Sequence, residues 1–289
     1  MMLRLADGLG RGRGRMRLLD HWNPPPPPRL KPNLTNWESR KLAAAWLGHA
    51  TLLLRIGGKT ILTDPVLSHR IGVGFGLFTV GLKREIAAAL QVNELPKIDL
   101  ILSSHAHMDH LDRPTLARLK KTTPVVAAPR TGDLIRDLGF HRLTELGWGD
   151  STQLGDVNIT ACPVTHWGAR TFRDTWRGYN GYVLDDGKHR VLFTGDTADH
   201  DFRGIGSVDL AIIGIGAYDP YIAAHATPEQ AWAMADQVRA RWLLPIHHST
   251  FKLSHEPMSE PMQRMLVAAG PEASRLIIRE IGGEWFCDD

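Results

Sequence analysis

The chain has 289 residues, 43% of them apolar, so it can bury one large hydrophobic core. Its formal net charge of +3 is uneven, because five arginines against one aspartate give +4 in residues 1–17 and leave −1 for the rest. A near-neutral body lacks the broad basic face of a nucleic-acid-binding protein. The two distant cysteines, Cys162 and Cys287, exclude a disulfide framework.

The hydropathy of the chain indicates in which cellular compartment the protein lies. The sequence contains no run of the roughly 18 to 20 apolar residues that cross a bilayer, and its start lacks the apolar region of a secretory signal. We therefore expect a cytoplasmic protein. Contact with a membrane surface stays compatible with the sequence, because a protein can lie on a lipid surface without such a segment.

Residues 1–40 differ in composition from everything after them. They combine Gly-Arg alternation with five consecutive prolines at 24–28, and tryptophans stand at Trp22 and Trp37. Proline runs favour polyproline II structure. We expect a basic, proline-rich tail and strap that wraps the surface of a single domain over residues 41–289. The alternative is a ligand for a proline-recognising partner.

Short apolar runs begin at residue 42. Those at 42–47, 51–56 and 59–63 predict strands, and Gly57-Gly58 predicts a tight hairpin between the last two. The third run leads into Asp64, a carboxylate placed to hold a neighbouring loop through hydrogen bonds. Residues 71–82 alternate apolar side chains with glycine, which weakens both helix and strand. This segment is either a mobile apolar flap that shelters an acyl chain or an irregular part of the core.

Four potential metal ligands crowd into six positions: His105, His107, Asp109 and His110. An aliphatic run at 98–102 predicts a buried strand before them, and Asp112 starts a predicted helix that runs to residue 121. Burying three imidazoles beside a carboxylate costs several kcal/mol unless a cation or hydrogen bonds compensate. The pattern therefore predicts a metal site rather than a structural cluster of histidines.

Further apolar runs predict strands at 125–127, 157–164, 190–193 and 242–246, with a helix near 133–138. Three of these strands lead into another potential ligand, namely His166, Asp196 and His247. Trp167 and Arg170, just after His166, are candidates for contact with a substrate phosphate. Because strands and helices mix without regular βαβ repeats, and no glycine-rich nucleotide loop is present, we expect packed sheets flanked by helices.

Other residues qualify as neighbours of such a site. His225 lies just before Thr227, which caps a predicted helix, so we expect His225 to donate a hydrogen bond or a proton to a leaving oxygen. The alternative is an exposed histidine at a helix start. His49 either hydrogen-bonds a carboxylate such as Asp64 or caps a turn. Tyr218 either lines the entrance or is an ordinary loop tyrosine.

The pattern H-x-H-x-D-H resembles that of the metallo-β-lactamase superfamily. The order of His166, Asp196 and His247 is also similar, as are the segments 46–51, 62–65, 195–197, 215–218 and 245–247. Together they resemble the branch that contains N-acyl-phosphatidylethanolamine phospholipase D and its bacterial relatives. The resemblance covers roughly residues 42–255. It implies an α/β fold, an αββα four-layer sandwich of two mixed β-sheets flanked by helices.

The resemblance also implies how the ligands divide. One divalent cation would be bound by His105, His107 and His166, the other by Asp109, His110 and His247, with Asp196 bridging the two. His248 stands where the lipase relatives carry an aromatic residue, which keeps it as a second candidate beside His247. We assign catalytic roles to Asp109 and His225. The candidates for supporting the ligands or contacting substrate are His49, Asp64, Tyr218 and His248.

Imidazole and carboxylate ligands without thiolate favour zinc, with manganese or iron as alternatives. Two cations about 3.5 to 4 Å apart can share a hydroxide that attacks phosphorus. Two dications, two carboxylates and this hydroxide leave a net charge of about +1, which favours an anionic phosphodiester. We therefore predict a dinuclear phosphodiesterase of the phospholipase D type, acting on a small or lipid phosphodiester. The alternatives are a phosphorylated-sugar lactonase, a cyclic-nucleotide phosphodiesterase and, more distantly, a non-catalytic metal-binding or sensing protein.

Overall fold

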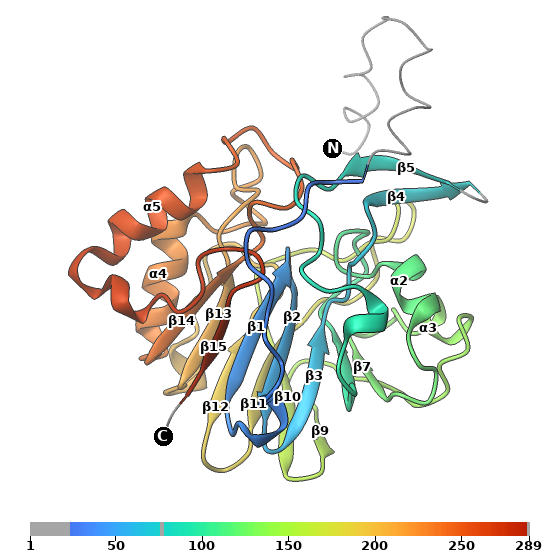
Figure 1. Ribbon diagram of the computed structural model, residues 1–289, viewed down its shortest axis with the longest axis horizontal. Helices are drawn as coiled ribbons and strands as arrows, with labels where there is room; N and C mark the ends of the chain where they lie inside the picture. The colour runs from blue at the N-terminus through green and yellow to red at the C-terminus, as the bar shows by residue number, and fades with distance from the viewer. Residues whose placement is uncertain (1–23, 76–77, 288–289) are drawn as a thin grey trace, which may run out of the picture.

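Two β-sheets pack face to face, as shown by a computed structural model that describes residues 24–75 and 78–287 (Figure 1). Within these residues the first sheet has seven strands in the order β15-β1-β2-β3-β6-β7-β8: β1 (Ala43–Gly48), β2 (Thr51–Ile56), β3 (Lys59–Thr63), β6 (Leu100–Ser103), β7 (Val125–Ala127), β8 (Leu143–Glu145) and β15 (Glu284–Phe286). Neighbours from β15 to β3 are antiparallel, and those from β3 to β8 are parallel.

The second sheet has six strands in the described part of the chain, in the order β14-β13-β12-β11-β10-β9: β9 (Ser151–Leu154), β10 (Val157–Cys162), β11 (Gly181–Asp185), β12 (Arg190–Phe193), β13 (Leu210–Gly214) and β14 (Trp242–Ile246). Here β9 to β12 are antiparallel, whereas β12, β13 and β14 are parallel. Both sheets are therefore mixed, as the family resemblance implies.

Helices flank the sheets. On the outer face of the second sheet lie α4 (Pro228–Gln237) and α5 (Glu260–Ala269), and beside β7 of the first lie α2 (Arg113–Arg118) and α3 (Asp133–Arg136) (Figure 1). Short 3₁₀ turns complete the set: η2 (Trp37–Ser39), η3 (Val92–Glu94), η4 (Arg203–Ile205) and η5 (Gly270–Arg275). The result is the predicted αββα sandwich. None of the helices in the described residues is long and apolar enough to cross a membrane.

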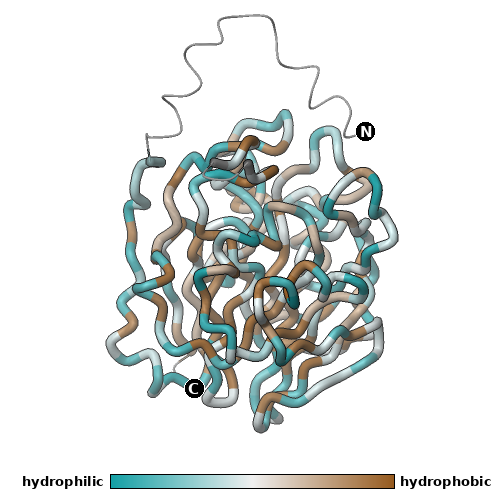
Figure 2. Tube along the Cα trace, turned by 90° about the vertical axis from the view of Figure 1, so that its right-hand side faces the viewer, coloured by the Kyte–Doolittle hydropathy of each residue, from teal (hydrophilic) through white to brown (hydrophobic). Residues whose placement is uncertain are grey.

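The main hydrophobic core lies between the two sheets. Every residue of β1 and β2 is buried, because the second sheet covers their inner side and residues 24–40 pass over the outer side (Figure 1). In that segment Trp37 is buried and donates its indole N–H to Thr60 Oγ1 over 3.0 Å. The brown, apolar stretches of Figure 2 run through the middle of the molecule. The basic tail predicted for residues 1–23 lies outside the described residues.

The described residues of the segment 71–82 form two regular strands, although the sequence analysis expects its glycines to weaken both helix and strand. Strands β4 (Arg70–Phe75) and β5 (Phe78–Lys83) pair as an antiparallel ribbon that stands off from both sheets (Figure 1). Gly72 faces Gly81 across the ribbon, with φ angles of +145° and +157°. A Cβ on Gly72 would lie 2.1 Å from the carbonyl oxygen of Val80. The glycines therefore permit the close approach of the two strands instead of breaking them.

Candidate metal centre

Four strand ends deliver the predicted ligands to one edge of the sandwich. The loop after β6 carries His105 to His110, and β10, β12 and β14 lead into His166, Asp196 and His247. Their ligand atoms form overlapping groups, each within 4.8 Å, and two of these hold all seven: His105, His107, His166 and Asp196 in one, and Asp109, His110, His247 and His49 in the other. Smaller groups join Asp196 and His247 with His225, and His105 and His110 with Asp64. The structure thus brings together all seven residues that the sequence singles out as ligands, with His49 added.

Asp196 lies between the two groups. Its Oδ1 is 3.2 Å from His247 Nε2, and its Oδ2 is 3.1 Å from His110 Nε2. The same Oδ2 lies 3.8 Å from the Nε2 atoms of His105 and His166. A single buried carboxylate therefore faces members of both groups, which is the position that a bridging ligand requires.

The donor atoms fit metal ions. His105 Nε2 and His107 Nδ1 approach to 2.8 Å, and His107 Nδ1 and His166 Nε2 to 3.3 Å, so three ring nitrogens converge. Among the described residues, His110 Nε2, His247 Nε2 and Asp196 Oδ1 are buried without a hydrogen bond. A divalent cation satisfies such converging lone pairs. Neither ligand group includes a cysteine, which agrees with ligands for zinc, iron or manganese.

Hydrogen bonds behind the histidines fix their rings. His110 Nδ1 lies 2.7 Å from Asp64 Oδ2, and His166 Nδ1 lies 2.9 Å from the carbonyl oxygen of Ala224. His105 Nδ1 lies 2.9 Å from Ser104 Oγ, and that residue also donates its backbone N–H to Asp64 Oδ1. Partners of this kind set the ring orientation of metal-binding histidines. Asp64 therefore supports two neighbouring segments of the ligand loop.

His49 makes the predicted contact with a carboxylate. Its Nε2 lies 2.9 Å from Asp109 Oδ2, so the partner is Asp109 and not Asp64, the example that the sequence suggested. Tyr218 is buried, and its hydroxyl donates to Glu260 at the start of α5. Its ring also lies 4.8 Å from the guanidinium carbon of Arg264, so the contacts of Tyr218 are with α5, and its place at the entrance stays a prediction.

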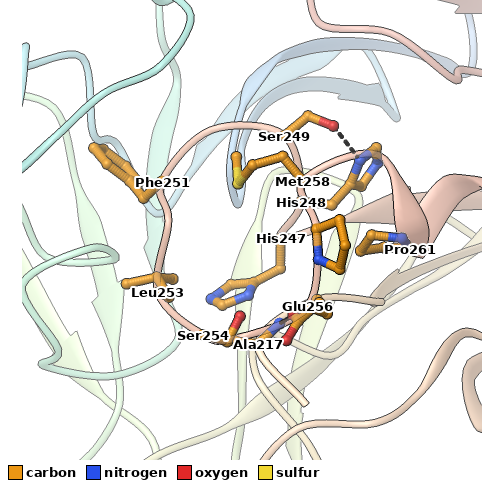
Figure 3. Close-up of a pocket in the computed structure, with 12 residues that line it drawn as sticks. Ala217, His247, His248, Ser249, Phe251, Leu253, Ser254, Glu256, Met258 and Pro261 are labelled. Atoms are coloured by element: carbon orange, nitrogen blue, oxygen red, sulfur yellow. Dashed lines mark hydrogen bonds between the residues drawn. The ribbon is translucent and has the colours of Figure 1, made fainter. Parts of the chain in front are cut away.

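His247 and His248 point to opposite sides of the chain (Figure 3). The ring of His248 turns toward Ser249, where its Nδ1 lies 2.8 Å from the hydroxyl, and it packs on Trp46 with ring centroids 4.7 Å apart. Only His247 belongs to the ligand groups of the described residues. The choice between the two imidazoles therefore falls on His247.

His225 sits at the rim of the centre. Its side chain is 15% exposed, and its Nδ1 lies 3.8 Å from Asp196 Oδ2. The helix cap predicted at Thr227 is present, since Thr227 accepts a hydrogen bond from the backbone N–H of Gln230. Burial lowers the pKa of His225 to about 3, so the ring is neutral near pH 7 in the metal-free protein.

Two residues of the loop after β10 contact the ligand loop. Arg170 donates Nη1 to the carbonyl oxygens of Leu111 and Ala106, so it holds the ligand loop, although the sequence suggested contact with a substrate phosphate. Trp167 packs its ring on His107, with centroids 4.3 Å apart. The sequence analysis also missed Ser104, although a polar residue between a buried strand and the first histidine was a usable signal.

Strained backbone gathers around the centre. The non-glycine residues with positive φ include His49 at 55°, Asp64 at 31°, Ala217 at 68°, His247 at 63° and Ser249 at 56°. Such conformations cost of order 1–3 kcal/mol each and cluster at functional sites. The surrounding hydrogen bonds must outweigh this cost, which agrees with a preorganised centre.

The charges at the centre stabilise one another. Burial opposes ionisation of Asp109 and Asp196, but the neighbouring imidazoles, His110 first, hold the pKa of both carboxyls well below the usual range. Burial also opposes the charged form of His110, yet the two carboxylates raise its pKa well above the ordinary value. Burial opposes the charged form of His247 as well, but the carboxylates of Asp196 and Asp109 raise the pKa of His247 to about 9. In the metal-free protein these two histidines therefore hold protons at neutral pH.

Metal uptake at pH 7 is expected to release about two protons per chain, because His110 and His247 must become neutral to bind a cation. A pH indicator in weakly buffered solution measures the release as Zn²⁺ is added to metal-free protein. At pH 10, above the pKa of His247, the release should be smaller. Equal release at both pH values would contradict the assignment of His247.

Similarities to known proteins agree with this fold and with a metal centre. The family model described as beta-lactamase superfamily domain matches residues 59–248. N-acyl-phosphatidylethanolamine-hydrolyzing phospholipase D 1 of Caenorhabditis elegans is 32% identical over 275 residues, which cover 86% of this chain and 76% of that protein. A UPF0173 metal-dependent hydrolase of Cupriavidus taiwanensis is 31% identical over 232 residues, which cover 73% and 75% of the two chains.

Among solved structures, the isothiocyanate hydrolase from Delia radicum gut bacteria superposes with a TM-score of 0.68 at 18% identity, covering 85% of this chain and 98% of that one. This likeness concerns the fold, whereas the family model and the two relatives concern the sequence. The chain therefore belongs to the metallo-β-lactamase superfamily, as a metal-dependent hydrolase.

Proposed function

We propose that the protein is a dinuclear phosphodiesterase of the phospholipase D type. The observation that carries the proposal is the placement of Asp196, which faces His110 and His247 in one ligand group and His105 and His166 in the other. A carboxylate in this position supports two cations close enough to act on one substrate group. The relative of C. elegans named as a phospholipase D supports the same substrate class.

Two bound cations would supply a water of lowered pKa and positive charge for the phosphoryl oxygens. The residues of the chain would fix the geometry in which this water attacks phosphorus. Asp109 and Asp196 stay ionised, so the centre would keep a positive balance of about one charge with two cations and one hydroxide bound, and an anionic phosphodiester is attracted more strongly than a neutral ester. Trp167 covers His107 and limits the access of bulk water on that side.

His225 is placed to assist the leaving group. It is neutral at pH 7 in the metal-free protein and partly exposed at the rim, so a ring N–H can reach a substrate oxygen. We propose that it donates a hydrogen bond to the leaving oxygen as the P–O bond breaks. We propose zinc as the metal, because the ligand groups combine imidazole with carboxylate; iron and manganese are the alternatives.

The ribbon supports a lipid substrate and contact with a membrane surface. Its inner residues Ile71 and Leu82 pack near Met108, within the ligand loop, so the ribbon rises next to the centre. Farther out, the cross-strand neighbours Val73 and Val80 are 51% and 53% exposed. Exposed apolar side chains beside an active centre are typical of a lipid-contacting surface. We propose that an acyl chain or a bilayer surface covers them.

A substrate series tests the proposal. Metal-free protein loaded with Zn²⁺, Mn²⁺ or Fe²⁺ is offered N-acyl-phosphatidylethanolamine vesicles, a bis-aryl phosphodiester, cyclic AMP and a phosphorylated sugar lactone. We expect cleavage of the first two, and in ¹⁸O-labelled water the phosphomonoester product should carry the label because water attacks phosphorus. Hydrolysis of the lactone alone, or metal binding without turnover of any substrate, would contradict the proposal. Protein kept with a chelator is the control.

A further inference from the structure

The turn that carries His49 is held in a strained conformation. It joins β1 to β2, and His49 adopts a φ of 55°. Its backbone N–H donates to Thr250 Oγ1 over 2.7 Å, and its carbonyl oxygen accepts from Trp46 Nε1 at 2.8 Å. The same oxygen accepts the backbone N–H of His247 at 3.1 Å. Two of these hydrogen bonds, those with Thr250 and His247, therefore fix the backbone of His49 to the segment that bears a proposed ligand.

The side chain of His49 points at a second proposed ligand. It is 1% exposed, and its Nε2 lies 2.9 Å from Asp109 Oδ2. An ionised carboxylate accepts hydrogen bonds and donates none, so the hydrogen of this contact belongs to His49 Nε2. His49 Nδ1 has no hydrogen-bond partner among the described residues. The contact thus fixes one tautomer of the ring, with Nε2 as the donor.

We infer that His49 is a positioning residue for Asp109 and thereby sets the metal affinity of the group formed by Asp109, His110 and His247. The inference rests on the proposed metal centre, although it does not depend on the substrate. Hydrogen bonds from outside the ligand set typically change metal affinity by about 10- to 100-fold when they are lost. The rival assignment makes His49 a fourth ligand through the same nitrogen, because its ligand atom lies within 4.8 Å of the others in that group.

Glutamine and asparagine separate these assignments. In His49→Gln the amide nitrogen lies near the place of Nε2 and can still donate to Asp109, whereas in His49→Asn the shorter amide lies near the place of Nδ1 and cannot reach. Asparagine tolerates a positive φ better than glutamine, so a loss in His49→Asn does not come from the backbone. His49→Ala removes the side chain. His248→Phe is the matched control, because His248 is equally buried yet packs on Trp46 away from the carboxylates.

The experiment titrates each metal-free variant with Zn²⁺ against a chromophoric chelator and records the absorption spectrum after loading with Co²⁺. We expect two ions in the wild type, His248→Phe and His49→Gln, with similar affinities. In His49→Asn and His49→Ala one of the two ions should bind about 10- to 100-fold more weakly. Thermal unfolding of the metal-free variants checks that they are folded, and the Gln and Asn pair decides the question if His49→Ala does not fold.

Four results would overturn the inference. Equal weakening in His49→Gln and His49→Ala, with an altered Co²⁺ spectrum, would make the imidazole itself a ligand. Unchanged affinity in every variant, or full affinity in His49→Asn, would leave the hydrogen bond without effect. Uptake of a single ion by the wild type would also overturn it. Two ions without phosphodiester cleavage would refute the proposed function and leave the metal-affinity test of His49 intact.

Discussion

Phosphodiester turnover is expected to fall by about 10³-fold or more when Asp196 is replaced by asparagine. Asparagine keeps the shape of the side chain but has no charge, and one of its two terminal atoms is an amide nitrogen that donates hydrogen bonds and cannot bind a cation. The loss affects both ligand groups at once, because Asp196 contacts His110 and His247 as well as His105 and His166.

The metal content of the variant is measured by elemental analysis, and its activity is measured as the turnover of a bis-aryl phosphodiester. Asp199→Asn is the matched control, because Asp199 lies three residues away on the same loop and is exposed. We expect the control to match the wild type, and we expect Asp196→Asn to hold fewer than two ions while folding normally. Two ions and nearly full turnover in Asp196→Asn would remove the basis of the proposed dinuclear centre.

The strands that end at proposed ligands could be predicted from the sequence. The apolar runs at 190–193 and 242–246 coincide with β12 and β14. Each is an aliphatic run with a buried interior and stops where Asp196 or His247 must face the centre, so hydropathy and chemistry mark the same boundary. The family resemblance added the αββα arrangement, which hydropathy alone left as packed sheets flanked by helices.

Elements with weak apolar periodicity could not be predicted. The strands β8 and β9 have only partly buried or exposed side chains, and the sequence analysis identified neither. The ribbon depends on the pairing of Gly72 with Gly81, a contact between residues nine positions apart that local propensity scores as unfavourable. The conformation of these segments depends on strand pairing in the folded protein, which local secondary-structure propensity does not describe.

Within the metal centre, too, contacts between residues that are distant in the sequence could not be predicted. The ligand cluster was predictable because His105 to His110 stand in six consecutive positions. The partner of His49 was not, since Asp109 is sixty residues away and the direction of the His49 ring depends on a turn with a φ of 55°. Tyr218 shows the converse case, because its loop position suggested exposure while α5 covers it.

The second large effect is expected at His225, where replacement by alanine should lower turnover of an alkyl phosphodiester by about 10²- to 10⁴-fold. An alkoxide is a poor leaving group, so its oxygen must receive a hydrogen bond or a proton as the P–O bond breaks. The ring of His225 is neutral because burial lowers its pKa to about 3, and a neutral ring donates a hydrogen bond through its N–H. His225→Gln, which keeps an amide donor, should therefore recover part of the loss.

Leaving-group chemistry distinguishes this role from a structural one. p-Nitrophenolate leaves without help, so His225→Ala should cleave bis(p-nitrophenyl) phosphate at close to the wild-type rate while failing on the alkyl diester. Metal content must stay at the wild-type level, and His255→Ala, which removes a histidine that is 77% exposed, is the matched control. Equal losses on both substrates would indicate damage to the centre, since His225 lies 3.8 Å from Asp196, and would refute donation to the leaving oxygen. A loss confined to the poor leaving group follows only if the imidazole acts on the departing atom.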